Sequence, residues 1–340
     1  MRSNRIVTVF GAYGHTGRFV VSELLKRGLV PILSGRNSVR LNALAKAHPG
    51  LEVRVASVGD PASLDRAVSG AAAVINCAGP FIDTAVQVVE AALRARIHYL
   101  DIAAEQAAVL DIFERFAERR DASVVIIPAM AFYGGLSDLL ATTAMGDWST
   151  ADAIDIGVAL DSWKPTLGTR LTGKRNAGPR FVFSNKRLKR GDSPPARTWN
   201  FPPPFGKQDV VGLSFAETIT ISSHLRTPEV RAYLNLAAVN DVRDPDTPAP
   251  TAADESGRSS QIFVVDAIVR SGSEERRAMA RGRDIYAITA PIVVEAVERV
   301  LDGRFNATGA VAAGQTFVAR EFLTSLVPKH LSLEINADGS

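Results

Sequence analysis

Short apolar runs alternate with amphipathic segments from Ile6 to about Ile127. This is the pattern of a parallel β-sheet covered by helices. It predicts strands at residues 6–10, 30–35, 51–56, 72–77, 97–102 and 123–128. Apolar residues at helical spacing predict helices at 18–27, 38–47, 62–68, 84–94 and 106–119. Together these elements predict a doubly wound α/β domain.

The pattern changes after Met130. A helix is predicted at 137–145, followed by strands at 153–160, 180–184, 217–222 and 261–270. Because the strands alternate without long helices between them, we expect a mixed or antiparallel sheet with one exposed face. Residues 241–260 are rich in Pro, Ala, Asp and Ser, which predicts a mobile surface loop. A last helix is predicted at 289–301.

These patterns divide the chain into three parts. Residues 1–130 are expected to form the α/β domain, and residues 131–285 an α+β domain for substrate binding or dimerisation. Residues 286–340 are expected to form a helix and a tail that return to the first domain. A length of 340 residues agrees with more than one domain. The sequence is compatible with a homodimer, because an exposed face of the second sheet would otherwise remain partly apolar.

Composition narrows the classes of protein. With 46% hydrophobic and 22% charged residues, the chain has a globular composition. A net charge of +3 is too small to indicate a nucleic-acid partner. Apolar runs stay well below the roughly 18 residues of a membrane span, and the single Cys77 allows no internal disulfide, so we predict a cytoplasmic protein. The five histidines lack partners at metal-ligand spacing, and no metal site is predicted.

A glycine motif follows the first predicted strand, in VFGAYGHTGRFV at residues 9–20. Such a turn before a helix gathers free N–H groups and the positive end of the helix dipole, where a pyrophosphate fits. Gly11 would permit the turn, Gly14 would let the phosphate approach, and Gly17 would let the helix lie close to the strand. We therefore predict dinucleotide binding over a purely structural turn. The other predicted contacts of this loop are Tyr13, His15 and Thr16.

The end of the second strand indicates which dinucleotide binds. NAD-binding units usually have an acidic residue there, whereas this chain has SGRN at residues 34–37. The charged fork of an arginine suits a phosphate monoester, which a carboxylate would repel. We therefore predict NADP(H), with Arg36 as the main contact and help from Ser34, Asn37 and Arg40. The alternative is that Arg36 is merely solvated and that Asn37 or Ser38 caps a helix.

Several segments resemble the saccharopine dehydrogenase-like oxidoreductases, which include saccharopine reductases and trans-acting enoyl reductases. They are VFGAYGHTG, LSGRN, VINCAGPF, HYLDIAAE and GRDIYAITAPIVVEAVERVLDG. The likeness is strongest over residues 5–130 and returns weakly over 282–325. It implies an NADP-binding Rossmann domain and a second domain that shapes the substrate pocket. It also implies hydride transfer to or from a C=N, C=C or C=O group.

The resemblance implies a second cofactor loop. Residues Cys77, Ala78, Gly79, Pro80 and Phe81 match the loop that lies along the cofactor near the nicotinamide in that family. Small residues let the backbone approach a ligand, and a proline stiffens the turn. The alternative is an ordinary strand-to-helix turn.

Two segments depart from the family pattern. Residues 104–105 read AE where Gly-Glu is usual, and residues 131–135 read AFYGG where the family has Gly-Phe-Asp with a nearby proline. Both segments fall where the substrate or the nicotinamide would lie. The resemblance therefore does not carry over the identity of the substrate.

Reduction of a C=N or C=O group needs a proton donor or a hydrogen bond to the atom that gains charge. Tyr99 and Asp101 share one face of the fifth strand. Asp101 could instead cap the next helix, and Glu105 could only complement its dipole. Tyr133, in a glycine-flanked loop, is the preferred pocket-facing hydroxyl, with plain packing as the alternative. The second-domain candidates are Lys164, Lys174, Arg175 and His224.

Three functions remain open from the sequence. The first is an NADPH-dependent oxidoreductase that acts on a small or lipid-like metabolite. The second is an NADP-binding sensor or scaffold without turnover. The third is a saccharopine-type amino-acid dehydrogenase, which would need a basic pocket for substrate carboxylates. Lys174 would then grip a carboxylate or phosphate, with a solvated loop as the alternative, and the other expected bases are Arg170, Arg175 and Arg180.

Overall fold

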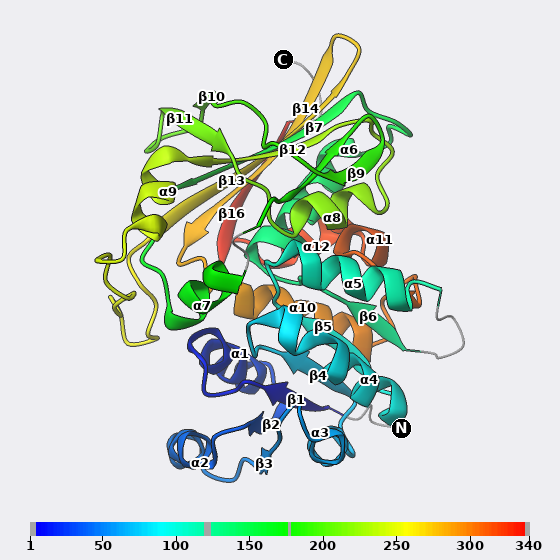
Figure 1. Ribbon diagram of the computed structural model, residues 1–340, viewed down its shortest axis with the longest axis vertical. Coiled ribbons are helices and arrows are strands. Elements are labelled where there is room, and N and C mark those ends of the chain that lie inside the picture. The colour runs from blue at the N-terminus through cyan, green and yellow to red at the C-terminus, as the bar shows by residue number, and fades with distance from the viewer. Residues whose placement is uncertain (1–4, 119–123, 176–177, 337–340) are drawn as a thin grey trace. The chain divides into compact units, whose positions relative to one another are not determined.

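The computed structural model describes residues 5–118, 124–175 and 178–336. The chain divides into two compact units (Figure 1). The first unit comprises Met1–Ala131, Thr289–Val311 and Gln315–Phe317. The second unit comprises Phe132–Ile288, Ala312–Gly314 and Val318–Ser340. The C-terminal part of the sequence therefore contributes to both units.

The first unit is built on a parallel sheet of seven strands in the order β15-β6-β5-β4-β1-β2-β3. Six of the strands lie where the apolar runs predict them, and β15 from the C-terminal part adds an edge strand next to β6. The predicted doubly wound sheet is therefore confirmed. The strands are β1 (Ile6–Phe10), β2 (Val30–Gly35), β3 (Val53–Val55), β4 (Ala73–Asn76), β5 (His98–Asp101), β6 (Val125–Ile127) and β15 (Gly309–Ala310).

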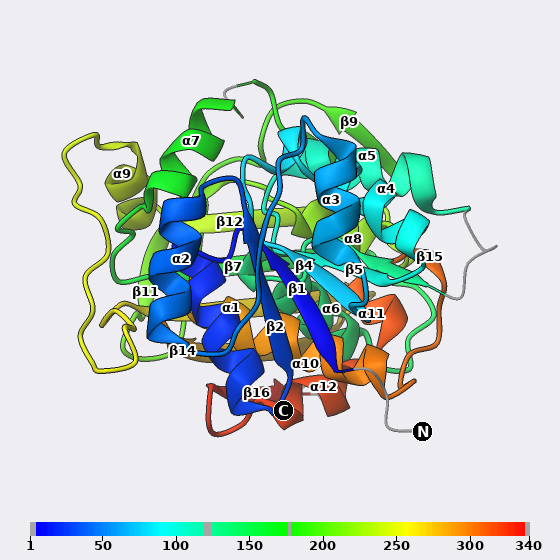
Figure 2. The ribbon, with the colours of Figure 1, turned by 90° about the horizontal axis from the view of Figure 1, so that it is seen from below.

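Helices cover both faces of this sheet. Helices α3, α4 and α5 pack beside one another, and α1 packs against α10 (Figure 2). Helix α1 begins at His15, immediately after the glycine turn, and α2 has the predicted bounds. The helices are α1 (His15–Lys26), α2 (Ser38–Ala47), α3 (Pro61–Val68), η1 (Phe81–Asp83), α4 (Ala85–Ala95), α5 (Gln106–Phe116) and α10 (Thr289–Leu301).

The second unit is built on a sheet of nine strands, and its main path is β10-β11-β12-β7-β13-β14-β16. Strands β7 and β12 are parallel and the other pairs are antiparallel, so the expected mixed sheet is confirmed. The strands are β7 (Ala153–Leu160), β8 (Phe181–Ser184), β9 (Arg187–Arg190), β10 (Arg197–Asn200), β11 (Lys207–Gly212), β12 (Val230–Asn235), β13 (Ile262–Ser271), β14 (Glu274–Arg283) and β16 (Leu331–Asn336).

Helix α6 packs on β13 and β14 of this sheet, and α8 and α12 pack against α6. The residues before α6 form a π-helical turn, η2, in contact with both α6 and α8. Helix α11 (Ala313–Thr316) has residues in both units. The other helical segments are η2 (Phe132–Leu136), α6 (Ser137–Met145), α7 (Leu167–Arg175), α8 (Glu217–Ser222), α9 (Leu236–Arg243) and α12 (Ala319–Ser325).

An aromatic cluster stabilises the second sheet. The Trp199 ring occupies the space next to Gly157, where an added Cβ would lie 2.5 Å from the ring. Its indole N–H donates to the buried Asp266 carboxylate at 2.7 Å. Phe201, Tyr233 and Val264 belong to the same cluster. Glycine on β7 is therefore required by the close approach of the tryptophan.

The strand predicted at 217–222 is wrong, because ETITIS forms helix α8. Alternating Thr and Ile suggested one buried face, but residues 217–221 are all buried, so the alternation does not mark a face. The Glu217 carboxylate accepts the Phe215 N–H at 2.8 Å. The hydroxyls of Ser222 and Ser223 donate to carbonyls one turn earlier. These local bonds pair some of the polar side chains within the helix.

Two further segments differ from their predictions. The predicted surface loop begins after residue 243, because Leu236–Arg243 form α9 on β11 and β12. The strand predicted at 51–56 is reduced to Val53–Val55 at the sheet edge, where it pairs only with β2. Within the described ranges, every helix is too short or too polar to cross a bilayer.

Candidate functional site

The order of the first sheet reverses between β1 and β4. From β1 the chain builds outward through β2 and β3, and it then returns to build β4, β5 and β6 on the other side of β1. The loops after β1 and β4 therefore meet at the carboxyl edge of the sheet. A Cβ added at Gly11 would lie 2.8 Å from the Ala78 nitrogen. Ligands of doubly wound folds bind in the crevice at this switch point.

The glycine loop lies on one side of this switch point. Gly11 has φ +88°, which favours glycine, and a Cβ at Gly17 would lie 2.3 Å from the Gly11 carbonyl oxygen. Gly14 is the N-cap of α1, so no side chain caps the helix, and its first turn holds no acidic residue. His15 is exposed at the first helical position, and Thr16 follows half-buried. The start of α1 can thus receive an anion.

The end of β2 is joined to the glycine loop. The Ser34 carbonyl accepts the N–H groups of Gly11 at 2.8 Å and Ala12 at 3.1 Å. The Ser34 hydroxyl is buried and has no hydrogen-bond partner among the described residues. A buried hydroxyl without a partner beside a predicted phosphate site fits a missing ligand contact.

The predicted 2′-phosphate contacts follow the end of β2, next to the glycine loop. Arg36 and Arg40 are exposed, and the Arg40 guanidinium lies 5.8 Å from the centroid of the Tyr13 ring. The Asn37 side chain accepts the Arg40 N–H at 2.9 Å and so caps α2. A Cβ at Gly35 would lie 2.8 Å from the Tyr13 ring. The segment thus combines a helix cap with two exposed cationic side chains, Arg36 and Arg40.

The loop Cys77–Phe81 lies on the other side of the switch point, against Gly11. The Asn76 side chain accepts the Ala78 N–H at 3.0 Å, and the Thr84 hydroxyl donates to the Ala78 carbonyl at 2.7 Å. Gly79 is exposed and is joined to Pro80 by a cis peptide bond. Cys77 is a half-buried free thiol, and burial raises its pKa well above the usual value. Cys77 is therefore held as the neutral thiol.

Tyr99 and Asp101 share a face of β5, as predicted, and both are fully buried. The Tyr99 hydroxyl donates to the Asp101 carboxylate at 2.8 Å. The same carboxylate accepts the N–H groups of Ala103 at 2.9 Å and Ala129 at 2.7 Å. Burial raises the pKa of Asp101 to about 6. These contacts tie β5 to the loop after β6 and leave neither group open to a substrate.

Tyr133 lies in the π-helical turn η2 of the second unit. Its ring stacks on Phe215 with a centroid distance of 4.1 Å and lies 5.8 Å from the Trp163 ring. Burial raises the pKa of the Tyr133 hydroxyl well above 10, and the nearby Tyr286 and Glu217 add to this. The hydroxyl has no hydrogen-bond partner within the described part of the chain.

Glu217 was not predicted as a site residue. It is buried, and burial raises its pKa to about 7. One carboxylate oxygen accepts the Phe215 N–H, whereas the other has no partner among the residues described. The Arg180 guanidinium lies 4.8 Å from the centroid of the Phe215 ring and donates to the Ser214 carbonyl at 2.8 Å. The carboxyl group of Glu217, the guanidinium of Arg180 and the phenol ring of Tyr133 thus all lie close to Phe215.

The remaining basic residues predicted for the site differ in their exposure and in their contacts. Lys174 and Arg175 are exposed on α7, a helix in which no residue is buried. Lys164 is half-buried. The His224 ring lies 2.6 Å from the buried Asp138 carboxylate, which also accepts the Gly314 N–H. Burial opposes the charge on His224, but Asp138 raises its pKa overall.

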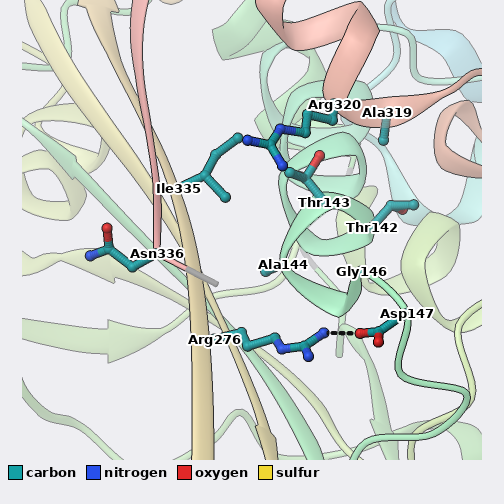
Figure 3. Close-up of a pocket in the computed structure, with 10 residues that line it drawn as sticks. All are labelled: Thr142, Thr143, Ala144, Gly146, Asp147, Arg276, Ala319, Arg320, Ile335 and Asn336. Atoms are coloured by element: carbon teal, nitrogen blue, oxygen red, sulfur yellow. Dashed lines mark hydrogen bonds and ion pairs between the residues drawn. The ribbon is translucent and has the colours of Figure 1, made fainter. Parts of the chain in front are cut away.

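A pocket of about 310 Å³ opens in the second unit, between α6, β14, α12 and the end of β16 (Figure 3). The Arg276 guanidinium reaches Asp147 across its mouth and stacks at 4.2 Å on Trp148. None of the residues predicted for the site lines this pocket. Within the described ranges, no cluster of three or more His, Cys, Asp or Glu residues could hold a metal ion.

The parallel sheet with its switch point between β1 and β4 and the glycine loop after β1 give the first unit a Rossmann-like fold. Residues 11–110 match the model of a family described as NAD(P)H-binding. The probable mitochondrial saccharopine dehydrogenase-like oxidoreductase of Arabidopsis thaliana is 33% identical over 114 residues, 29% of this chain and 25% of that protein. The human saccharopine dehydrogenase-like oxidoreductase is 29% identical over 117 residues, 29% of this chain and 27% of that protein. The match thus spans about a quarter of these relatives.

The fold is similar over almost the whole chain to a solved structure. Apo saccharopine dehydrogenase (L-Glu forming) from Saccharomyces cerevisiae aligns with a TM-score of 0.68 over 98% of this chain and 100% of that chain. The sequence identity is 13%, so this likeness establishes a shared fold. The resemblance to saccharopine dehydrogenase-like oxidoreductases is confirmed by these relatives.

Proposed function

We propose that this protein is an NADPH-dependent oxidoreductase that reduces a C=N, C=C or C=O bond in a small or lipid-like metabolite. The observation that carries the proposal is the crevice between the loops after β1 and β4, with Arg36 exposed at the end of β2 and no acidic residue there. The names of the curated relatives, both oxidoreductases, support the same class of reaction.

The residues present fit a phosphorylated dinucleotide. The uncapped start of α1 would hold the pyrophosphate, with Gly14 leaving room for it. Arg36, helped by Arg40 and the Ser34 hydroxyl, would bind the 2′-phosphate, because a guanidinium pairs well with a phosphate monoester. When bound, the cofactor supplies a hydride from its nicotinamide ring.

Tyr133 is our proposed proton donor to the substrate atom that gains charge. Its hydroxyl is protonated at neutral pH because burial keeps its pKa high, and no described residue uses its hydrogen-bonding capacity. The aromatic rings of Phe215 and Trp163 beside it would suit an apolar or conjugated substrate. Tyr99 and Asp101 bind each other and are assigned a structural role.

Cofactor binding is the direct test of this function. The purified protein is titrated with NADPH and with NADH while the fluorescence of the reduced nicotinamide is followed. We expect NADPH to bind at least about tenfold more tightly, since a phosphate–arginine contact contributes on the order of 1.4 kcal/mol or more. Equal affinities would contradict the role of Arg36. Oxidation of NADPH is then followed with imines, enones and ketones.

A non-catalytic NADP-binding sensor or scaffold is the second candidate. It is favoured by the bonded state of Tyr99 and Asp101 and by the exposure of Lys174, which leave Tyr133 alone among the predicted catalytic residues. Tight NADPH binding without turnover of any compound class would support it. A cytoplasmic location and a homodimer stay predictions.

The saccharopine-type dehydrogenase is not proposed. Arg170 donates to the carbonyl oxygens of Asp244 and Thr247, and Lys174 and Arg175 are exposed on α7. The fourth expected base, Arg180, lies over the Phe215 ring and donates to the Ser214 carbonyl. One base beside Phe215 is too few for the basic pocket that a polycarboxylate substrate would require.

A further inference from the structure

We propose that Glu105 is a positioning residue for the nicotinamide half of the cofactor. Its carboxylate holds the loop Cys77–Phe81 in one shape, and that shape completes the crevice. This inference rests on the proposed function, because it assumes that a nicotinamide dinucleotide binds with its nicotinamide half beside this loop, as the family resemblance implies. It assigns to Glu105 neither proton transfer nor contact with the substrate.

Glu105 binds the loop through both oxygens of a buried carboxylate. It is the N-cap residue of α5, which follows β5, and it is 2% exposed. One of its carboxylate oxygens accepts the Phe81 N–H at 3.0 Å and the other accepts the Ile82 N–H at 2.8 Å. These amides belong to the first residues of the short helix η1, which have no acceptor within that helix. A charged acceptor makes both bonds stronger than neutral ones.

The opposite end of the loop is fixed in a similar way. Asn76 and Thr84 bind the N–H and the carbonyl of Ala78. Side chains from β4, the start of α4 and the start of α5 therefore fix both ends of a five-residue segment. Between these ends lies Gly79, which is exposed and carries no side chain. Its backbone is the part of this loop that a ligand can approach most closely.

The loop also lies directly against the glycine loop. The backbone of Cys77 and Ala78 lies where a Cβ on Gly11 would be, at 2.8 Å, so the two loops are in contact. If the loop moved, the backbone that faces Gly11 would move with it. A loop that visits the competent shape only part of the time binds its ligand more weakly by that fraction.

Replacement of Glu105 by glutamine tests the inference. The amide keeps one acceptor oxygen, but its NH2 group would face a loop N–H, leaving one buried donor unsatisfied. The Glu105→Gln variant is titrated with NADPH and with adenosine 2′,5′-bisphosphate, which carries the adenine half and its 2′-phosphate but no nicotinamide. We expect the Kd for NADPH to rise about tenfold or more while the Kd for the bisphosphate stays within about twofold.

Glu114→Gln is the matched control, because Glu114 is exposed on the same helix, α5. It should change neither Kd. Unchanged NADPH affinity in Glu105→Gln would overturn the inference, and so would an equal loss for both ligands, which indicates a general structural defect. If that variant does not fold, Glu105→Asp is measured in the same way, since it keeps the charge but cannot reach both amides; its NADPH affinity should fall selectively.

The outcomes for the wild-type protein separate the two proposals. If the wild type binds neither ligand, the proposed function fails and the inference with it. If the wild type prefers NADH, the Arg36 argument fails, but the same comparison made with NADH and ADP still decides the role of Glu105.

Discussion

The two units treat their buried polar side chains differently. In the first unit, Asn76, Tyr99, Asp101 and Glu105 all bond to neighbouring groups. Among its described residues, the buried atoms without a partner are Ser34 Oγ, beside the predicted cofactor site, and Gln87 Oε1. In the second unit, four buried atoms in and next to the contacting elements η2 and α8 have no hydrogen-bond partner among the described residues. They are Tyr133 Oη, Ser137 Oγ, Glu217 Oε2 and Thr218 Oγ1.

This difference indicates a division of roles. Buried polar groups in native proteins are nearly always paired, so a concentration of unpaired groups marks a place where a ligand or water completes the set. The paired network of the first unit gives a rigid support for the cofactor loops. The unpaired groups in the second unit retain hydrogen-bonding capacity, which the proposed function assigns to substrate binding. The following changes test each side of the comparison.

The largest effect is expected from Gly17→Ala in the first unit. The new Cβ would lie 2.3 Å from the Gly11 carbonyl oxygen and 3.0 Å from that of Ala12, both backbone atoms. We expect a loss of about 3 kcal/mol in the free energy of unfolding, measured by denaturant titration, and loss of NADPH binding. Gly59→Ala is the control, because nothing lies within 4 Å of its added Cβ. Wild-type NADPH affinity in Gly17→Ala would refute the packing argument.

The second prediction contrasts two buried carboxyl groups with raised pKa values, one in each unit. Burial raises the pKa of Glu217 to about 7, so the folded state binds more protons than the unfolded state between about pH 4.5 and 7. The free energy of unfolding therefore falls as pH rises through this range. Glu217→Gln should abolish this fall and stabilise the protein at pH 8 by up to about 3 kcal/mol.

Asp101→Asn is the matched variant in the first unit. The pKa of Asp101 is also raised, to about 6, but its carboxylate accepts three hydrogen bonds. An amide cannot accept all of them, so we expect destabilisation by about 1–3 kcal/mol at pH 7 rather than a gain. Urea denaturation at several pH values measures both variants. Stabilisation by Asp101→Asn, or destabilisation by Glu217→Gln at pH 8, would remove the contrast between the units.

The smallest change in stability is expected for Tyr133→Phe. Its hydroxyl has no hydrogen-bond partner among the described residues, so its removal should leave the unfolding free energy unchanged or raise it by up to about 1 kcal/mol. Turnover of any substrate that the panel identifies should fall at least about a hundredfold. Tyr99→Phe, which loses the bond to Asp101, should instead destabilise by about 1–2 kcal/mol. Unaltered turnover in Tyr133→Phe would exclude its role as proton donor.

The first unit could be predicted from the sequence because its signals are local. Buried parallel strands read as continuous apolar runs, and Gly11, Gly14 and Gly17 mark a turn whose geometry tolerates no side chain at Gly11 or Gly17. The edge strand β15 was not predicted, because it has two residues and pairs with β6 from far along the chain.

The second unit was harder to predict because tertiary contacts determine it. Strand β14 carries few large apolar residues, and Arg277 and Arg281 on it pair with acidic residues of neighbouring strands. Helix α8 is almost entirely buried, so its residues do not separate into an apolar and a polar face. Its alternating Thr and Ile therefore predicted a strand wrongly. Because this segment was predicted as a strand, Glu217 was not recognised as an acidic residue at the start of a helix. That position was the signal that could have identified it.

The central claim is that the crevice binds a 2′-phosphorylated dinucleotide through Arg36. The most direct measurement is the ratio of the NADPH and NADH dissociation constants for the wild type and for Arg36→Asp, determined by fluorescence titration. We expect the wild type to prefer NADPH and the variant to lose at least about a hundredfold of that preference, because a carboxylate repels the phosphate and can bind the ribose hydroxyl. The same ratio in both proteins would contradict the account.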